Sequence, residues 1–198
     1  MPELMHSPFD FFARFLVLTK ESRVLVDSTI DLIGVAKGEI LIKEGQPSPY
    51  MYIIRKGIAR GFAFEDGEDK TFTLWAENYA FGDITNYITN YPPIKSYELL
   101  EDSELYRLDI TRFRELFSLN IELATLGRIL IEKHIVNQEL TRRLYINKDS
   151  SERFVVFLRE KPGLIHRVKF KYIASFLGMR PETFTRLHTR WVKNNYIP

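Results

Sequence analysis

The pattern of hydrophobic and polar positions near the end of the chain predicts a helix that begins at Pro181. Hydrophobic or aromatic residues recur there at positions i, i+3, i+4 and i+7, namely Phe184, Leu187, His188 and Trp191. This spacing places them on one face of a helix, and that face is expected to be buried. Proline suits the first turn because no backbone N–H is needed there. The opposite face carries polar and charged residues: Glu182, Thr185, Arg186, Thr189, Arg190 and Lys193.

A shorter hydrophobic pattern just before this segment predicts another helix that packs against it. Ile173, Ala174 and Leu177 lie on one side of that helix, and Ala174 is small enough for a close crossing. Gly178 suits a chain reversal in which φ is positive. Residues 170–191 are therefore predicted to form a helix, a tight turn and a second helix. The alternative for this pattern is a solvated pair of amphipathic helices in an ordinary helical domain.

Turn signals divide the chain between residues 37 and 110 into short segments rich in β-branched and aromatic residues. These signals lie about 7 to 15 residues apart, at 37–38, 44–45, 56–57, 66–67, 81–82 and 92–93, and the runs between them include 39–43, 50–55, 70–75 and 103–108. Many short strands at such intervals indicate a sandwich, jelly roll or barrel. Asp66-Gly67 is a candidate hairpin turn. A helical stretch over 8–33 is expected to pack against the β structure.

From about residue 111 to 145 the hydrophobic spacing changes to a helical period. A helix over 120–143 would be about 36 Å long, which is more than a small β domain covers. Alternating steps of three and four residues are typical of the a and d positions of a coiled coil. The helix is therefore predicted to pair with a second copy of the chain through Leu123, Leu126, Leu130, Asn137, Leu140 and Leu144. Asn137 would fix the register of that dimer. The alternative is a helix that lies on the β domain, with Lys133 and Asn137 in solvent.

Composition excludes several classes of protein. The chain has 198 residues, of which 45% are hydrophobic and 14% aromatic, so it can bury a substantial core. It contains no cysteine, which excludes disulfides, thiolate metal sites, iron–sulfur clusters and a cysteine nucleophile. No hydrophobic run approaches the roughly 20 residues of a transmembrane helix, and the N-terminus lacks a signal-peptide core. A cytoplasmic protein without a membrane partner is expected.

Charge is divided unevenly along the chain. Residues 151–198 hold ten Lys or Arg against three Asp or Glu, a net charge of +7, whereas residues 1–150 hold 18 against 23. A basic two-helix unit is expected to meet the phosphate backbone of double-stranded DNA. We therefore predict an α+β protein with a β-roll or jelly-roll effector domain over 1–145, which includes the long dimerisation helix, and a helix-turn-helix domain over 146–198.

This order of elements, together with five sequence motifs, resembles the Crp/Fnr family of bacterial transcription regulators. The motifs lie at 37–45, 52–57, 81–83, 105–109 and 173–186. The resemblance implies a cytoplasmic homodimer, not an enzyme, in which an effector domain biases the orientation of two recognition helices. It also implies double-stranded DNA and RNA polymerase as partners.

The resemblance also assigns roles to residues of the second helix. In this family the Glu and Arg of an Arg-Glu-Thr-x-x-Arg sequence read bases, and the matching segment here runs from Pro181 to Arg186. Glu182 would accept a hydrogen bond from a cytosine amino group, and Arg186 would donate to guanine O6 and N7. The remaining DNA-binding candidates, expected at phosphates or on the same exposed surface, are Lys169, Lys171, Arg180, Thr183, Thr185 and Arg190.

Three departures from the family pattern affect this reading of the DNA-binding unit. Pro181 replaces the first Arg of the family sequence, so one base contact is absent and a different target site is expected. Arg180 stands where a Ser would cap the helix. The β wing that usually follows has no sequence after Ile197 and Pro198, so the wing is expected to be truncated and the affinity lower.

The effector site departs further from the family. The family's cyclic-nucleotide cassette reads Phe-Gly-Glu and then Pro-Arg-Ser/Thr-Ala, with the Glu at the ribose and the Arg at the cyclic phosphate. Here Asp83 replaces the Glu, Ile94 replaces the Arg, and Lys95 would point to the opposite face of a strand. Cyclic AMP is therefore not expected as the effector. The candidate pocket holds either a different small molecule or none, and its residues are Gly82, Asp83, Ile84, Lys95 and Ser96.

Two further classes of protein were considered. A jelly roll could be a cupin-like metalloenzyme, but that site needs paired histidines and a carboxylate. The four histidines, at 6, 134, 166 and 188, are isolated, so neither a metal nor a haem is supported and no cofactor is expected. The stronger rival to a DNA-binding regulator is a non-DNA-binding sensor or partner-binding module.

Overall fold

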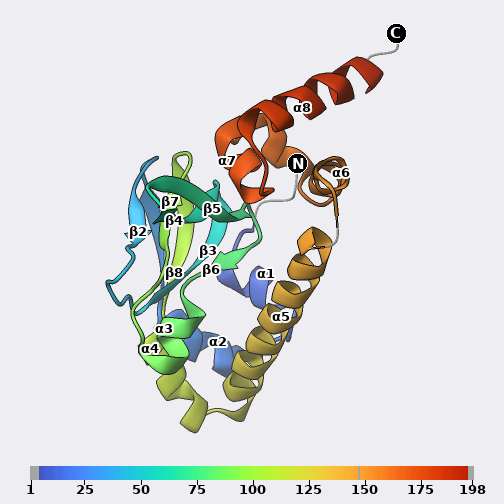
Figure 1. Ribbon diagram of the computed structural model, residues 1–198. Helices are drawn as coiled ribbons and strands as arrows, with labels where there is room; N and C mark the ends of the chain where they lie inside the picture. The colour runs from blue at the N-terminus through green and yellow to red at the C-terminus, as the bar shows by residue number, and fades with distance from the viewer. Residues whose placement is uncertain (1–4, 147, 196–198) are drawn as a thin grey trace.

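The computed structural model describes residues 5–146 and 148–195, and the side chains of 140–146, 194 and 195 lie outside what it describes. Two four-stranded antiparallel sheets face each other as a β-roll (Figure 1). The first sheet has the order β1-β8-β3-β6, with β1 (Ile30–Val35), β8 (Ser103–Asp109), β3 (Tyr50–Lys56) and β6 (Ala80–Phe81). The second has the order β2-β7-β4-β5, with β2 (Ile40–Ile42), β7 (Ser96–Leu99), β4 (Ala59–Glu65) and β5 (Glu68–Trp75). The predicted α+β class is confirmed.

Helices precede, interrupt and follow the roll. Before it lie α1 (Pro8–Phe12) and α2 (Lys20–Asp27), and α3 (Ile84–Thr89) lies between β6 and β7. After it come α4 (Ile110–Glu115), the 3-10 turn η1 (Leu116–Ser118) and the long helix α5 (Ile121–Ile146). The C-terminal module, residues 150–195, consists of α6 (Ser150–Glu160), η2 (Pro162–His166), α7 (Phe170–Phe176) and α8 (Pro181–Asn195). This module sits at the end of α5, and α8 extends away from the roll (Figure 1).

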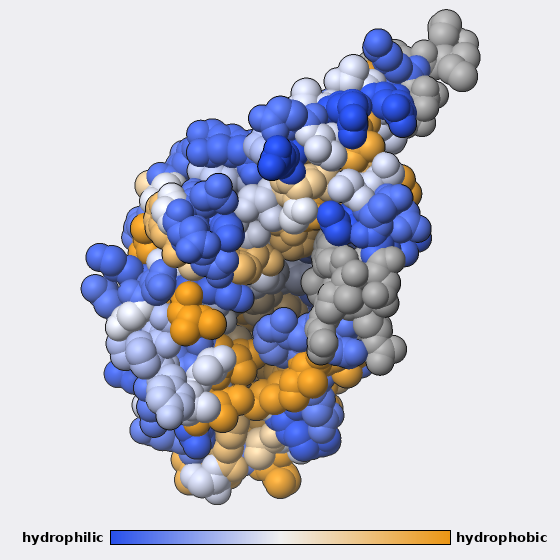
Figure 2. All heavy atoms as spheres, viewed as in Figure 1, coloured by the Kyte–Doolittle hydropathy of each residue, from blue (hydrophilic) through white to orange (hydrophobic). Residues whose placement is uncertain are grey.

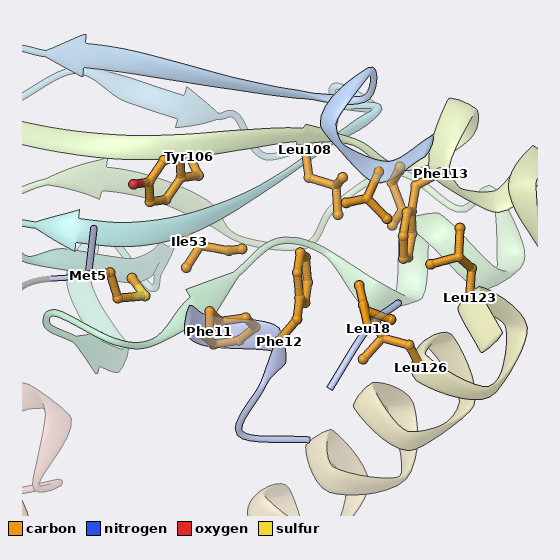
Figure 3. Packing of buried hydrophobic residues seen from close by; sticks show 12 residues of the cluster. Met5, Phe11, Phe12, Leu18, Ile53, Tyr106, Leu108, Phe113, Leu123 and Leu126 are labelled. Atoms are coloured by element: carbon orange, nitrogen blue, oxygen red, sulfur yellow. The ribbon is translucent and has the colours of Figure 1, made fainter. Parts of the chain in front are cut away.

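The first sheet is hydrophobic on both of its faces because side chains alternate along its strands. Tyr52, Ile54 and Leu105 belong to the cluster between the two sheets. Ile53 and Leu108 come from the same strands but belong to a different cluster, on the outer face of the sheet. Figure 3 shows that outer cluster, where side chains of α1 and α5 meet the sheet. The roll therefore has an interior and a second buried layer outside its first sheet.

The strands predicted over 39–43, 50–55, 70–75 and 103–108 are all present, as β2, β3, β5 and β8. The hairpin predicted at Asp66-Gly67 is confirmed: the two residues connect β4 to β5, with φ of 53° and 79°. Positive φ at both central positions is the geometry that a two-residue hairpin requires.

The predicted helical stretch over 8–33 is wrong at its end. Helix α2 stops at Asp27, where the Ser28 hydroxyl donates to the Leu25 carbonyl and the Thr29 hydroxyl donates to the Val26 carbonyl. Side-chain hydroxyls of this kind compete with the backbone for helical hydrogen bonds. The chain then continues as β1, which pairs antiparallel with β8.

The helical segment predicted from about 111 to 145 is divided, and the helix predicted over 120–143 is present as α5. Residues 110–118 form α4 and η1, and a separate helix begins at Ile121. The side-chain oxygen of Asn120 accepts a hydrogen bond from the backbone N–H of Leu123 at 3.1 Å, which satisfies one of the free donors at the start of α5. An asparagine cap is the local reason for the break.

Candidate DNA-binding surface and effector pocket

Helix α8 presents one packed face and one exposed face, as its hydrophobic spacing predicts. Phe184 is 0% exposed, and its ring lies 5.0 Å from the ring of Phe170 and 5.5 Å from that of Phe154. Leu187 and Trp191 pack against the same cluster. This packing holds α8 against α6 and α7, so the opposite side of the helix faces solvent.

The polar face of α8 carries the predicted recognition residues. Glu182, Thr185, Arg186 and Arg190 are exposed, whereas Thr183 is half-buried. The Thr185 hydroxyl donates to the Pro181 carbonyl at 2.9 Å, which leaves its oxygen lone pairs as acceptors. Neither Arg186 nor Arg190 forms an ion pair within the described part of the chain.

The turn between α7 and α8 fixes the angle between the two helices. Gly178 has a φ of 61°, as predicted, and the N–H of Met179 donates to the Ala174 carbonyl at 3.0 Å. The Arg153 guanidinium of α6 donates to the Gly178 carbonyl at 3.3 Å. Ile173, Ala174 and Leu177, the predicted inner face of α7, are at most 1% exposed.

The predicted phosphate-contacting cations lie at the two ends of α7. Lys169 precedes α7, Lys171 lies on its first turn, and Arg180 directly precedes α8; all three are exposed. The Lys171 ammonium lies 4.8 Å from the centre of the Tyr172 ring. Arg180 therefore lies next to the polar face of α8, whereas Lys169 and Lys171 lie at the other end of α7.

The interior of the roll is filled by four aromatic rings. Phe81 stacks on Tyr52, Trp75 and Tyr97, with ring centroids 5.3 Å, 5.6 Å and 6.1 Å apart. Burial raises the pKa of Tyr52 to about 12, against a smaller opposite effect of Arg107, and burial also raises the pKa of Tyr97. Both phenols therefore stay neutral near pH 7.

The residues predicted for the effector pocket have other partners. The Asp83 carboxylate caps α3 by accepting from the Asn86 N–H at 2.7 Å. The Ser96 hydroxyl accepts from the Glu44 N–H at 3.0 Å, and the Lys95 ammonium lies 4.8 Å from the centre of the Phe72 ring. Ile94, where the family places its Arg, is 72% exposed.

The other two predicted pocket residues lie near the outer face of the first sheet. Gly82 lies beside Met51, where an added Cβ would come within 2.8 Å of the Met51 side chain. Ile84, the first residue of α3, lines a cavity of about 400 Å³ on the outer face of the first sheet. The five candidates therefore do not enclose one pocket.

Part of the predicted dimer stripe on α5 is wrong. Leu123 and Leu126 are 0% exposed and belong to the outer cluster of their own chain, together with Phe12 and Phe113. Leu130 is partly buried against the same cluster. The hydrophobic spacing correctly identified the buried face of α5. It did not show that the chain's own outer cluster covers this face. Asn137 is exposed, and the side chains of Leu140 and Leu144 lie outside those described.

Comparison with known proteins agrees with this architecture. The model of the cyclic nucleotide-binding domain matches residues 33–120. The transcriptional activator Anr of Pseudomonas aeruginosa is 23% identical over 172 residues, which cover 81% of this chain and 70% of Anr. The structure of FixK2 from Bradyrhizobium japonicum aligns with a TM-score of 0.71 at 17% identity, covering 85% of this chain and 87% of FixK2. These likenesses support a transcription regulator of the Crp/Fnr type.

A solved structure from Eubacterium rectale, described as a regulator of the Crp/Fnr family, shows how far the fold of such regulators extends along this chain. It aligns with a TM-score of 0.71 at 15% identity and covers 93% of this chain and 88% of its own. The domain match ends at residue 120, just before α5, whereas this structural likeness reaches into the C-terminal module. Across the described ranges, no helix is long and hydrophobic enough to cross a membrane, and no cluster of His, Asp or Glu suits a metal ion.

Sequence patterns missed the residues that attach the C-terminal module of this chain to its roll. Arg167 pairs with Glu77 at 2.6 Å and also with Glu101. Burial alone would raise the pKa of Glu77. The hydrogen bonds from Arg167 and from the backbone N–H groups of Gly57 and Glu77, together with the charge of Arg167, outweigh burial and lower that pKa. The buried Arg60 guanidinium, bound to Asp69 at 2.5 Å, lies 4.0 Å from the centre of the Tyr172 ring of α7. No local spacing links residues so far apart in sequence.

Proposed function

We propose that this chain is a sequence-specific DNA-binding transcription regulator that inserts α8 into the major groove. The observation that carries the proposal is the exposed polar face of α8, where Glu182, Arg186 and Arg190 lie opposite the buried Phe184. The major groove, about 12 Å wide, admits a helix of this kind. RNA polymerase is the further partner that regulation of transcription requires.

Glu182 and Arg186 are the proposed base-reading residues. They lie one helical turn apart on the exposed face of α8. The Glu182 carboxylate accepts from a cytosine amino group, and the Arg186 guanidinium donates to both acceptors of guanine. Thr183 and Arg180 contact phosphates, and Lys169 and Lys171 add charge from α7.

The regulator is further proposed to be a homodimer that binds a near-palindromic site. The support for the dimer is the side of α5 turned away from the outer cluster. Ile121, Ile135 and Val136 lie there with 83%, 61% and 52% of their surface exposed. Exposed hydrophobic residues on a helix of 26 residues are typical of a helix-pairing surface.

Cyclic AMP is proposed not to be the effector. Asp83 already caps α3, Ile94 offers no hydrogen bond, and stacked rings occupy the roll interior. A buried cyclic phosphate without a guanidinium partner would lose several kcal/mol of stabilisation. The roll of this regulator therefore lacks the family's ribose-binding Glu and its phosphate-binding Arg.

Electrophoretic mobility shift with genomic fragments, performed at a low and a higher salt concentration, tests the DNA-binding proposal. Fragment-selective binding that weakens steeply as salt rises is expected, because counterions are released when Lys and Arg neutralise phosphates. Lack of binding at low salt would instead favour a sensor or partner-binding module without a DNA target.

A further inference from the structure

The cavity on the outer face of the first sheet is separate from the filled interior of the roll. It measures about 400 Å³ and lies between α1, α3, the sheet and α5. Figure 3 shows Phe11 and Phe12 of α1 facing Ile53, with Phe113 beside them, and all four line the cavity. Figure 2 shows hydrophobic residues gathered between α3 and α5, on the face where the cavity opens. A volume of this size matches small-molecule sites in other proteins.

The lining of the cavity changes from hydrophobic to polar along α5. Gly127, Leu130 and Ile131 line its earlier part, and Lys133, His134 and Asn137 line its later part. The rise from Gly127 to Asn137 is about 15 Å. The cavity is thus amphipathic along its length, with a hydrophobic end beside Phe113 and a polar end further along the helix.

The charge of the cavity lining is positive. The lining includes Arg14 and Lys133 and no Asp or Glu. The Arg14 guanidinium donates to the Asn78 carbonyl at 2.5 Å and lies 5.7 Å from the centre of the Phe15 ring. Within the ranges described, no carboxylate pairs with Arg14 or Lys133, so both keep donors free for an anion.

His134 adds a neutral polar group at the same end. Burial lowers its pKa, and its Nε2 lies 3.0 Å from the Gln138 side-chain nitrogen. Arg14 and Lys133 therefore determine that the cavity favours a negatively charged ligand.

We propose that this cavity binds a small amphipathic carboxylic acid. Its hydrocarbon part packs against Phe113, Phe117 and Leu130, and its carboxylate accepts hydrogen bonds from Arg14 and Lys133. The ligand contacts the inner side of α5, whereas the exposed residues Ile135 and Val136 lie on other sides of that helix, so a dimer through α5 leaves the cavity accessible.

Isothermal titration of the full chain with octanoate, octanol and octylammonium tests this proposal. The three probes share one tail and differ in the charge of the head group. Saturable one-to-one binding of octanoate is expected, with octanol weaker and octylammonium weakest because it meets two cations. Binding of octylammonium as tight as octanoate, or no saturable octanoate binding, would overturn the assignment. The titration contains no DNA, so its outcome is independent of the DNA-binding proposal.

Two substitutions test which residues bind the carboxylate of octanoate. Arg14→Gln and Lys133→Gln should each weaken octanoate binding about tenfold and leave octanol binding unchanged, because each removes one charge-assisted hydrogen bond. Lys43→Gln removes an exposed cation far from the cavity and serves as the matched control, with no change expected. Unchanged circular dichroism and thermal midpoints establish that the variants fold. Octanoate binding that both Arg14→Gln and Lys133→Gln leave unaltered would contradict the proposed head-group site.

Discussion

At the scale of single residues, two positions of the cyclic-nucleotide cassette carry side chains that differ from those of the family. Asp83 occupies the place of the family's ribose-binding Glu and instead caps α3. Ile94 stands in place of the phosphate-binding Arg and is largely exposed. These two positions therefore lack the side chains with which the family binds the ribose and the phosphate of a cyclic nucleotide.

The first prediction follows from these two positions. Isothermal titration with cyclic AMP or cyclic GMP should show no saturable binding at micromolar concentration. Loss of a buried charge partner worth about 3 kcal/mol weakens binding roughly a hundredfold. Asp83→Asn keeps a capping side chain but removes its charge, and Lys95→Ala removes the nearest cation of the cassette. Micromolar cyclic AMP binding that either substitution abolishes would restore the cyclic-nucleotide reading.

At the scale of elements, the two faces of α5 show what sequence periodicity can and cannot predict. The spacing of Leu123, Leu126 and Leu130 correctly identifies a buried face. It does not say whether a second chain or the chain's own roll covers that face, because the spacing within one helix carries no information about its partner. The helix-turn-helix formed by α7 and α8 could be predicted in more detail. The burial of Phe184 and the positive φ of Gly178 depend on neighbours close in sequence.

The second prediction concerns the exposed side of α5. Ile135→Glu should convert a dimer into monomers, because pairing of the helices would bury an uncompensated charge. The substitution should leave the fold of one chain intact, since Ile135 is 61% exposed. Sedimentation equilibrium at micromolar concentration measures the change. Val24→Glu, at a residue 72% exposed on α2, is the control and should not alter the mass. A monomeric wild type under these conditions would sink the proposed interface.

At the scale of the whole molecule, the C-terminal module is joined to the roll by a shared hydrophobic cluster and by ion pairs. Ile58 and Leu74 of the roll pack with Phe157 and Ile173 of the module. The Thr71 N–H donates to the Ser175 hydroxyl at 2.9 Å. These contacts join residues about a hundred positions apart, which is why the sequence alone did not predict them. They determine where α8 lies relative to the effector domain.

The third prediction concerns the ion pairs that hold the module. Arg167→Gln should destabilise the docking of the C-terminal module on the roll by about 1–2 kcal/mol, because it leaves the largely buried Glu77 without its cation. The effect is limited to this size because Arg167 itself is partly exposed. Hydrogen exchange at the Thr71 amide is the measurement, and faster exchange is expected. Arg159→Gln breaks an exposed pair within the module and should change little. Equal exchange rates in wild type and Arg167→Gln would show that the pairs do not hold the module.

The ion pair between Arg167 and Glu77 also predicts how the docking of the C-terminal module on the roll depends on pH. The pKa of Glu77 is lower in the folded protein than the ordinary value of 4.5. Its contribution to stability is therefore fully present above pH 4.5 and is lost as the pH falls through the lower pKa of the folded state. Hydrogen exchange at Thr71, compared between neutral and acid pH and corrected for intrinsic rates, should show this loss in the wild type and not in Glu77→Gln. Identical pH dependence in the two proteins would exclude Glu77 as the responsible group.

The central claim is that α8 reads bases through Arg186. The most direct test is to select preferred DNA sequences from random duplexes with the wild type and with Arg186→Ala, and to compare them. The substitution should cost about 1–3 kcal/mol on the specific site and relax the preference at one base pair in each half-site. Lys171→Ala, the control at a proposed phosphate contact, should weaken binding to all sequences alike and reduce the salt dependence. Unchanged affinity and an unchanged preferred sequence for Arg186→Ala would contradict the placement of α8 in the major groove.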